Sequence, residues 1–374
     1  MEKAKKEEIL KRIETEIEKM RDKQNKMLFY VFDTKGNPSG SLEYIYNIAL
    51  LLKNSGYDVE MLYQTDGEDD EFVGVEEWLG EEYASLTHLN ISKDEVKVSA
   101  SDVLFIPEIF FNVMNQCKNL PCMKVAIMQN INFLVEQTPI SAQWGDVGIT
   151  HCICNTDSNA ELIHRLFPYV RTFVVPHIVK PMFHDTIAPR KFLINIITRT
   201  QNVINKIIKP FYWSHPEFKW VSFTDLRGYS KERFAEELRK GTITIWVDED
   251  TEFGLSALEA MKSQSIVIAK IPNKIPSWAL TKEGQLTNGC LWFDEYETLP
   301  DKLASVIGAV LTDNVPKDVF EAAKLVCENY TAEQAKDRIM HVIDLLSDIR
   351  INDMKSLAER TNDDNEEEKE EQHD

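Results

Sequence analysis

The fold of this chain is decided by residues 246–261, which read WVDEDTEFGLSALEAM. Residues 242–247 form an apolar, β-branched run that predicts a buried strand, and residues 265–269 predict the next strand. Between these strands, apolar residues recur at helical spacing from Gly254 onward. The stretch therefore predicts a strand–turn–helix–strand unit of an α/β protein.

The turn of this unit has the chemistry of a phosphate site. A helix that begins beyond the carboxyl end of a parallel strand points unpaired backbone N–H groups into the crevice where α/β proteins bind ligands. Gly254 lets a phosphate approach that backbone, and the helix dipole favours its negative charge. Glu259 lies about one turn into the helix, where a carboxylate accepts hydrogen bonds from sugar hydroxyls. These features predict a nucleotide-phosphate site; the alternative is an ordinary strand–turn–helix without a ligand.

The length and composition bound the class of protein. A chain of 374 residues is long enough for two domains of ordinary size. No apolar run approaches the roughly 20 residues of a membrane span, and the charged N-terminus differs from a signal peptide, so we expect a cytoplasmic protein. The six cysteines predict reduced thiols.

The formal charge of −20 is concentrated in two segments. Residues 65–83 hold nine acidic residues and no Lys or Arg, and residues 359–374 have a net charge of −7, so together these segments carry −16. The rest of the chain is near balance. Nucleic-acid binding needs positive charge along the backbone path, so a nucleic-acid partner is disfavoured but not excluded.

Residues 1–26 predict one charged amphipathic helix. Leu10, Ile13, Ile17 and Met20 recur at 3-4-3 spacing and form a narrow apolar seam. Two interpretations are equally good: a short coiled coil with a second copy or a partner protein, or a helix packed on its own domain.

The remaining segments predict two successive α/β units. In the first, strand 28–32, a glycine-containing loop, helix 41–54 and strand 57–62 form a βαβ unit. Residues 64–95 are acidic and predict a surface excursion. The second unit begins with strand 192–197, and the last helix is expected over about 332–346. Residues from 359 onward are too charged to bury, which predicts a disordered tail.

In their order along the chain, these motifs resemble those of GT-B glycosyltransferases, particularly retaining family 4 (glycosyl transferases group 1). Thr251 and Glu259 stand at the two ends of the family's "E-x7-E" signature, Gly40-Ser41 match its first glycine loop, and Arg199 matches its "G-R" arginine. The resemblance covers roughly residues 27–345. It implies an α/β fold of two Rossmann-like domains facing a central cleft.

The resemblance also implies a division of the chain. Its parts would be a charged helix (1–26), an acceptor domain (27–180), a nucleotide-sugar domain (181–330), a helix returning toward the acceptor domain (331–358) and the acidic tail (359–374).

By the same resemblance, the donor-binding residues would be Gly40, Ser41, Arg199, Lys206, Gly228, Tyr229, Thr251, Phe253, Gly254, Leu255, Ser256 and Glu259. The catalytic residues would be Arg199, Lys206, Glu252 and Asn130. Arg199, Lys206 and the helix that Gly254 opens would hold the diphosphate, so no metal or other cofactor is expected. The implied reaction transfers a sugar, with retention, from a nucleotide-diphosphate donor to a hydroxyl of a carbohydrate or another acceptor, as in polysaccharide biosynthesis.

The chain departs from the family pattern where the sugar binds. Thr251 replaces the first Glu of the signature, so only Asp250 or Glu252 can supply a carboxylate there. The amides of Gln129 and Asn130 stand where family members often carry His. These departures leave three alternatives: a catalytically inactive scaffold that binds a partner, a nucleic-acid-modifying glycosyltransferase, and a GT-A enzyme that binds metal through the D-x-D at Asp248 and Asp250.

Overall fold

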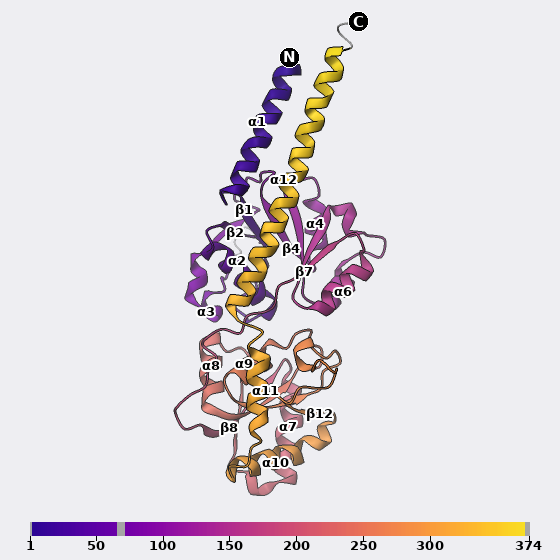
Figure 1. Cartoon of the computed structure of the whole chain (residues 1–374). Coiled ribbons are helices and arrows are strands. Elements are labelled where there is room, and N and C mark those ends of the chain that lie inside the picture. Colours follow the sequence, from indigo (N-terminus) through magenta and orange to yellow (C-terminus); the bar gives the residue numbers. More distant parts are fainter. Residues whose placement is uncertain (1, 66–71, 371–374) are drawn as a thin grey trace.

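The computed structural model describes residues 2–65 and 72–370. Its strands form a seven-stranded sheet and a five-stranded sheet, and all strand pairs within them are parallel. The two sheets lie one above the other along the long axis of the molecule, each with helices packed around it (Figure 1). The predicted architecture of two Rossmann-like units is therefore confirmed.

The first sheet has the order β3-β2-β1-β4-β5-β6-β7, so the direction in which strands are added reverses between β1 and β4. Alternating residues of β1 enter two different cores, with Met27 and Phe29 on the α2 and α12 side and Leu28 and Tyr30 on the α4 and α6 side. Such two-sided burial explains why residues 27–30 of β1 form a continuous apolar run. The strands are β1 (Lys26–Tyr30), β2 (Asp58–Tyr63), β3 (Thr87–Asn90), β4 (Val103–Pro107), β5 (Met123–Met128), β6 (Ile149–Cys154) and β7 (Arg171–Val174).

The second sheet has the order β12-β11-β10-β8-β9 and reverses between β8 and β10. Helices α8, α9 and α11 cover one face, and α7 and α10 cover the other. In open α/β sheets, ligands bind in the crevice at such a reversal, beyond the carboxyl ends of the strands. The strands are β8 (Lys191–Thr198), β9 (Ser222–Asp225), β10 (Gly241–Val247), β11 (Ile266–Lys270) and β12 (Leu291–Phe293).

The helices of the N-terminal half are α1 (Glu2–Arg21), α2 (Gly40–Asn54), α3 (Glu76–Leu79), η1 (Glu81–Ser85), α4 (Phe111–Gln116), α5 (Ile131–Gln137), η2 (Trp144–Val147) and α6 (Asp157–Leu166). Those of the C-terminal half are α7 (Gln201–Ser214), η3 (Pro216–Phe218), α8 (Lys231–Lys240), α9 (Leu255–Lys262), η4 (Ser277–Ala279), η5 (Tyr296–Thr298), α10 (Leu299–Leu311), α11 (Lys317–Cys327) and α12 (Ala332–Glu370). Among the described residues, no helix has the length and apolar content needed to span a bilayer.

The acidic segment 64–95 differs from the predicted surface excursion. Its described part contains α3, η1 and β3, and β3 pairs with β2 as the edge of the first sheet. Trp78 and Tyr83 are buried, and α3 packs on α8 of the C-terminal half. The apolar residues here are too widely spaced to form a helix or strand pattern, so only the tertiary structure shows where they pack. Residues 66–71 lie outside the described residues.

Helices α1 and α12 lie side by side and project together from the first sheet (Figure 1). Ile13, Ile17 and Met20 of the predicted seam pack with Met354 of α12, so the seam faces a helix of the same chain. Farther down α12, residues such as Ile339 and Ile343 join the core of the first sheet, so the predicted return of this helix to the N-terminal half is observed. A contact of α1 with a second copy or a partner protein stays a prediction.

Helix α12 also differs from the prediction at its end. It continues through residues 359–370, where we predicted disorder. Glu and Lys favour helix locally, and the packed part of α12 has already formed the first turns, so adding residues is easy. Residues 371–374 lie outside the described residues.

Two chain segments cross between the sheets. The first leaves β7 at Val174 and reaches β8 at Lys191, and the second joins α11 to α12. They touch where the Val179 backbone N–H donates to the carbonyl of Tyr330 at 2.8 Å. In the first segment, Lys180 donates to the carbonyl of Leu79 at 2.7 Å. The domain boundary near residue 180 stays a prediction, consistent with the position of these segments.

Candidate functional site

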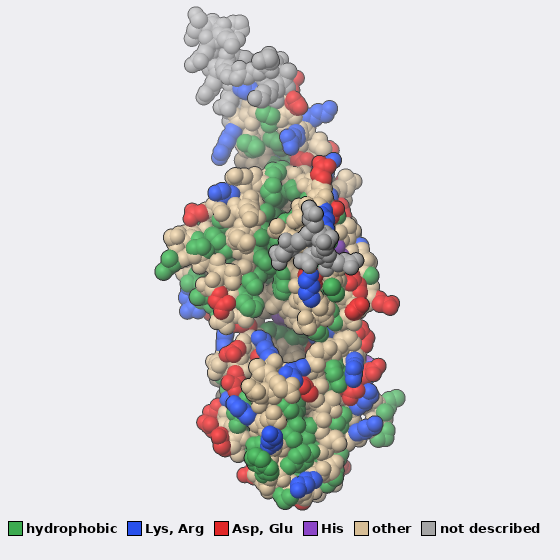
Figure 2. All heavy atoms as spheres, turned by 180° about the vertical axis from the view of Figure 1, so that it is seen from behind, with side chains coloured by type: hydrophobic (Ala, Val, Ile, Leu, Met, Phe, Trp, Pro, Cys, Tyr) green, Lys and Arg blue, Asp and Glu red, His purple; other side chains and the backbone are tan. Residues whose placement is uncertain are grey.

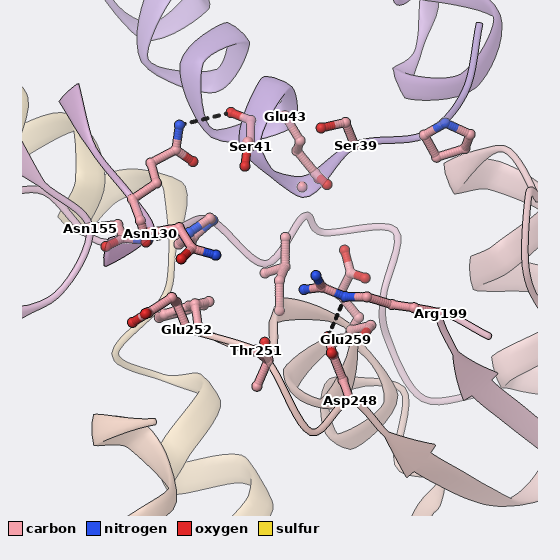
Figure 3. A pocket seen from close by; sticks show the side chains of 18 of the residues that line it. Ser39, Ser41, Glu43, Asn130, Asn155, Arg199, Asp248, Thr251, Glu252 and Glu259 are labelled. Carbon is pink, nitrogen blue, oxygen red and sulfur yellow. Dashed lines mark hydrogen bonds and ion pairs between the residues drawn. The ribbon is translucent and has the colours of Figure 1, made fainter. Parts of the chain in front are cut away.

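A cleft of about 470 Å³ lies between the two sheets, at the carboxyl ends of strands from both. Figure 2 shows the waist between the two lobes of the molecule, and Figure 3 shows the lining side chains pointing into the cleft from both walls. The residues that line it are Pro38, Ser39, Gly40, Ser41, Glu43, Trp78, Gln129, Asn130, Phe133, Asn155, His177, Arg199, Lys231, Asp248, Thr251, Glu252, Phe253, Gly254, Leu255, Ser256 and Glu259.

The N-terminus of α9 forms part of the C-terminal wall. Gly254 precedes the helix with a φ of 73°, in the left-handed region that favours glycine. A Cβ atom at Gly254 would lie 2.8 Å from the ring of Trp246, so this position excludes larger residues for steric reasons as well. No side chain caps α9, so the first N–H groups of the helix, at Leu255 and Ser256, remain available to an anion.

Arg199 and Asp248 meet at the reversal point of the second sheet. Arg199 follows β8, Asp248 follows β10, and the Arg199 Nε donates to Asp248 Oδ2 at 3.0 Å (Figure 3). Burial raises the pKa of Asp248, while Arg199 and the Thr251 hydroxyl oppose this rise. The Arg199 side chain is 62% exposed, so it is free to turn from Asp248 to a bound phosphate.

A lysine that holds Glu252 also bridges the two halves of the chain. Lys274, in the loop after β11, donates to the Glu252 carboxylate and also to Asn159 of α6, the latter at 3.3 Å. Glu252 therefore faces the cleft in a fixed position. Thr251 is only 3% exposed and has no carboxylate to offer a ligand.

A buried group of three charges crosses the cleft floor. The Lys231 Nζ, at the start of α8, lies 2.6 Å from Glu259 Oε1 and 2.7 Å from Glu43 Oε2 of the opposite wall. Burial lowers the pKa of Lys231, but the two carboxylates outweigh this effect, so the ammonium stays charged. The pKa of Glu259 is raised by burial, opposed by Lys231 and reinforced by Glu43. The group therefore links α2 of one half to α8 and α9 of the other.

The side of the cleft next to the segment that joins β7 to β8 is aromatic. The His177 ring stacks on Phe253 with centroids 4.2 Å apart and contacts Tyr44 at 4.7 Å. Burial, assisted by nearby Lys231, lowers the pKa of His177 to about 3, so this imidazole is neutral at physiological pH. It offers the cleft a hydrogen-bonding group without charge.

The carboxyl end of β5 presents two amides on the N-terminal wall. Gln129 donates to the carbonyl of Ser41 at 3.3 Å, and Asn130 caps α5 by accepting from the Asn132 N–H at 2.9 Å. Glu108, which follows β4, lies behind them and accepts the backbone N–H groups of Gln129 at 2.9 Å and Asn130 at 2.7 Å. Glu108 thus fixes the strand end that carries the amides, although it does not line the cleft.

Glu108 makes stability depend on pH. Burial raises its pKa from 4.5 to about 7, against the two backbone N–H groups that lower it. Between these pH values the folded protein keeps a proton that the unfolded chain has released, so the free energy of unfolding falls as pH rises. The glutamine of Glu108→Gln does not titrate. The free energy of unfolding of this variant, relative to that of the wild type, should therefore rise by roughly 3 kcal/mol between pH 4.5 and pH 7. Urea denaturation of both proteins at pH 4.5, 6 and 7.5 checks this, and parallel pH profiles would contradict it.

The acids of the D-x-D sequence point to different partners. Asp248 binds Arg199, Glu249 accepts from the Tyr296 hydroxyl at 2.8 Å, and Asp250 accepts from Asn273 at 3.2 Å. Among the described residues, no three His, Cys, Asp or Glu side chains are arranged to hold a metal ion.

Most of the predicted site residues lie together in the cleft. Three do not line it: Lys206, Gly228 and Tyr229. Lys206 is exposed on α7, with its Nζ 5.6 Å from the centre of the Tyr296 ring. Tyr229 packs under the guanidinium of Arg233, 4.0 Å from its ring centre.

Ten lining residues were not among the predicted site residues, and Glu43, Trp78 and Lys231 are three of them. Glu43 lies three residues after Gly40, and Lys231 lies two residues after Tyr229, so both are close in sequence to predicted donor-binding residues. Trp78 had no such signal, because it is an isolated aromatic residue in an acidic segment.

No protein-family model matches the sequence. No curated protein matches it either. Solved structures do resemble this one. HepE of Anabaena, solved in complex with UDP-glucose, is 12% identical with a TM-score of 0.61, and the match covers 85% of this chain and 99% of that one. The pneumococcal O-GlcNAc transferase GtfA, solved with UDP and GlcNAc, is 10% identical with a TM-score of 0.58 over 86% of this chain and 98% of that one.

A sucrose-phosphate synthase from Thermosynechococcus elongatus is also similar, at 10% identity and a TM-score of 0.57 over 86% of this chain and 99% of that one. These matches extend over nearly the full length of the other chains, and they agree with the two parallel sheets and the cleft between them. The chain has the GT-B fold of glycosyltransferases.

Proposed function

We propose that this protein is a glycosyltransferase that moves a sugar from a nucleotide-diphosphate donor to an acceptor hydroxyl. The observation that carries the proposal is the uncapped N-terminus of α9, which opens at Gly254 into a cleft shared by the two halves of the chain. Backbone N–H groups at a helix N-terminus bind phosphate, and the dipole of the helix adds to the attraction. The similar structures solved with UDP-glucose and with UDP support the same choice of ligand.

The lining charges define how the donor would be held. The cleft contains four carboxylates (Glu43, Asp248, Glu252, Glu259) and two cations (Arg199, Lys231). Lys231 is occupied by two carboxylates, so the diphosphate would rely on the α9 N–H groups and on Arg199, released from Asp248. Glu259 would accept a ribose hydroxyl. Donors of this kind stabilise the charge that develops on the leaving diphosphate, and they do so without a metal.

The transfer step breaks the bond between the sugar anomeric carbon and the phosphate oxygen and forms a bond from that carbon to the acceptor oxygen. The hydroxyl proton of the acceptor is released. Asp250 and Glu252 both adjoin Thr251 in sequence, but only Glu252 lines the cleft, where Lys274 holds it. We therefore assign Glu252 the stabilisation of positive charge at the sugar. Asn130 would bind a hydroxyl through its amide, which does not titrate near neutral pH. We propose retention of configuration at the anomeric carbon, in line with the family 4 motifs.

Turnover tests this function directly. We expect purified protein to release nucleoside diphosphate from one member of a panel of UDP-, GDP-, ADP- and dTDP-sugars in the presence of carbohydrate acceptors, with no loss of rate when a chelator is added. The anomeric configuration of the product, determined by NMR, tests retention. If no panel member is turned over, the protein is not an enzyme of this class.

The variant Gly40→Ala tests whether the donor binds in the cleft. A Cβ at Gly40 would meet no atom within 4 Å, so the variant should fold normally, with an unfolding free energy equal to or about 0.5 kcal/mol above the wild type. The added methyl group projects from a residue that lines the cleft, and we expect about tenfold weaker donor binding, or roughly 1.4 kcal/mol. Gly308→Ala in α10, where a Cβ also meets no atom within 4 Å, is the matched control and should leave binding unchanged. Equal affinities in the two variants would contradict this assignment.

An inactive GT-B scaffold is the second candidate function. It is favoured by Thr251 at the first signature position and by the pairing of both lining cations with carboxylates. This candidate would be supported if the protein binds a nucleotide but releases no nucleoside diphosphate from any nucleotide sugar.

A further inference from the structure

Two buried polar side chains on the N-terminal wall of the cleft are incompletely satisfied. Among the described residues, neither Oε1 of Glu43 nor Nε1 of Trp78 has a hydrogen-bond partner. Glu43 is 1% exposed and Trp78 is 3% exposed, and both line the cleft. Buried polar groups in folded proteins nearly always have partners. Unpaired groups at the wall of a cleft therefore mark positions that a ligand would complete.

The two groups come from neighbouring parts of the fold. Glu43 lies in the first turn of α2 and points into the space between the walls, toward the side from which Arg199 projects (Figure 3). Trp78 lies on α3, which packs on α8, the helix that begins with Lys231. The Lys231 Nζ lies 2.7 Å from Oε2 of Glu43. The other oxygen, Oε1, has no charged partner among the described residues.

The chemistry of this wall fits a hydroxyl better than a phosphate. A carboxylate oxygen accepts a hydrogen bond and an indole N–H donates one, while a sugar hydroxyl does both. A phosphate would be repelled by the negative charge of Glu43. On the opposite wall, Thr251 supplies no carboxylate for the sugar.

We infer that Glu43 and Trp78 form a hydroxyl-binding subsite for the sugar, so that Glu43 supplies from the N-terminal wall the carboxylate that is absent at Thr251. This inference rests on the proposed function. The sugar hydroxyls have two sources, the sugar of the donor and a carbohydrate acceptor, and the two share the same hydrogen-bonding chemistry.

The variants Glu43→Gln and Trp78→Phe test the subsite. The first replaces the carboxylate with an amide of the same shape and leaves the Lys231–Glu259 pair in place. The second removes the indole N–H together with the five-membered ring that carries it, and keeps one aromatic ring. The matched controls are Glu60→Gln and Trp144→Phe. Glu60 Oε2 and Trp144 Nε1 are also buried without a hydrogen-bond partner in the described residues, but neither residue lines the cleft.

Calorimetry would compare two arms. The first titrates each protein with UDP, GDP, ADP and dTDP and with their glucose esters. We expect both subsite variants to bind the preferred nucleoside diphosphate within twofold of the wild type and its glucose ester about tenfold more weakly, while the controls match the wild type throughout. The second arm adds glucose, N-acetylglucosamine and maltose to protein saturated with the diphosphate. If the affinity of the two subsite variants falls tenfold only in this second arm, the subsite binds the acceptor and not the sugar of the donor.

The outcomes separate the two proposals. Unchanged affinities of Glu43→Gln and Trp78→Phe in both arms overturn the subsite and leave the proposed function standing. Equal losses in the subsite variants and in the controls overturn it as well, because they show a general structural effect. A wild type that binds no nucleotide or nucleotide sugar overturns the proposed function and the subsite together. Thermal unfolding of each variant identifies any that fails to fold, and the other variant then carries the test.

Discussion

Replacing Gly254 with alanine is expected to weaken nucleotide binding roughly hundredfold and to lower the free energy of unfolding by about 2–4 kcal/mol. Two costs add at this position. The backbone has a φ of 73°, and a Cβ would lie 2.8 Å from the ring of Trp246, which is fully buried in the core of the second sheet. Relief of the clash would move the first turn of α9. Loss of two hydrogen bonds from its N–H groups to a charged phosphate would weaken binding roughly hundredfold.

Gly284→Ala separates these two costs. Gly284 has a φ of 78°, but a Cβ there meets no atom within 4 Å. The free energy of unfolding of this control should fall by only about 1 kcal/mol, because alanine is disfavoured in the left-handed conformation. Its affinity for nucleotide should equal that of the wild type. Urea denaturation and calorimetric titration of both variants provide the comparison. Equal stability losses in the two variants would show that the contact with Trp246 does not constrain this turn.

Replacing Lys231 with methionine is expected to have an equally large effect on stability. The change leaves the carboxylates of Glu43 and Glu259, each 1% exposed, without the ammonium between them. Removal of one partner from a buried ion pair costs about 3–5 kcal/mol, because the remaining charge is buried without compensation. We expect a loss of that size at pH 8, measured by urea denaturation.

The pH dependence identifies the cause of this loss. Burial already raises the pKa of Glu259 in the wild type, and removal of Lys231 raises it further. For a carboxyl group with a raised pKa, the destabilisation is complete above the folded pKa and vanishes near its ordinary value. The deficit of Lys231→Met should therefore shrink as pH falls from 8 to 5, and adding Glu43→Gln should recover part of it at pH 8.

Lys240→Met is the matched control for this experiment. Lys240 lies on the same helix, α8, and also pairs with two glutamates, Glu236 at 3.7 Å and Glu237 at 2.9 Å. Its side chain is 46% exposed, and exposed ion pairs contribute about 0–1 kcal/mol. Two results would contradict a buried charge group at Lys231. One is a loss in the free energy of unfolding of Lys231→Met no larger than that of Lys240→Met, and the other is a loss that does not change with pH.

The part of the fold that was predictable from sequence is the part buried on both faces of a sheet. Strand β4 (VLFIP) is a continuous apolar run, β10 and β5 are mostly apolar, and helix α10 ends where its apolar periodicity ends. Strand β3 was missed because its sequence, THLN, is mostly polar and it lies at the sheet edge. The end of α12 was missed because charge density alone predicted disorder, whereas the helix is continued from a packed segment.

The candidate site divides in the same way. The turn at Gly254 and the carboxylate of Glu259 are close in sequence, so their shared position on one strand–helix unit was predictable. The charge group formed by Glu43, Lys231 and Glu259 draws on α2, α8 and α9, and no spacing along the chain reveals that three such helices meet. Lys206 was assigned to the diphosphate by the family resemblance, but it does not line the cleft, and its side chain lies over Tyr296.

We propose that the cleft at the N-terminus of α9 binds a nucleoside diphosphate. Calorimetric titration of the wild type and of Gly254→Ala with UDP, GDP, ADP and dTDP tests it most directly. We predict that at least one diphosphate binds the wild type with a stoichiometry of one, and that Gly254→Ala binds it roughly a hundredfold more weakly. Failure of all four to bind the wild type, or equal affinity for the variant, would contradict the claim.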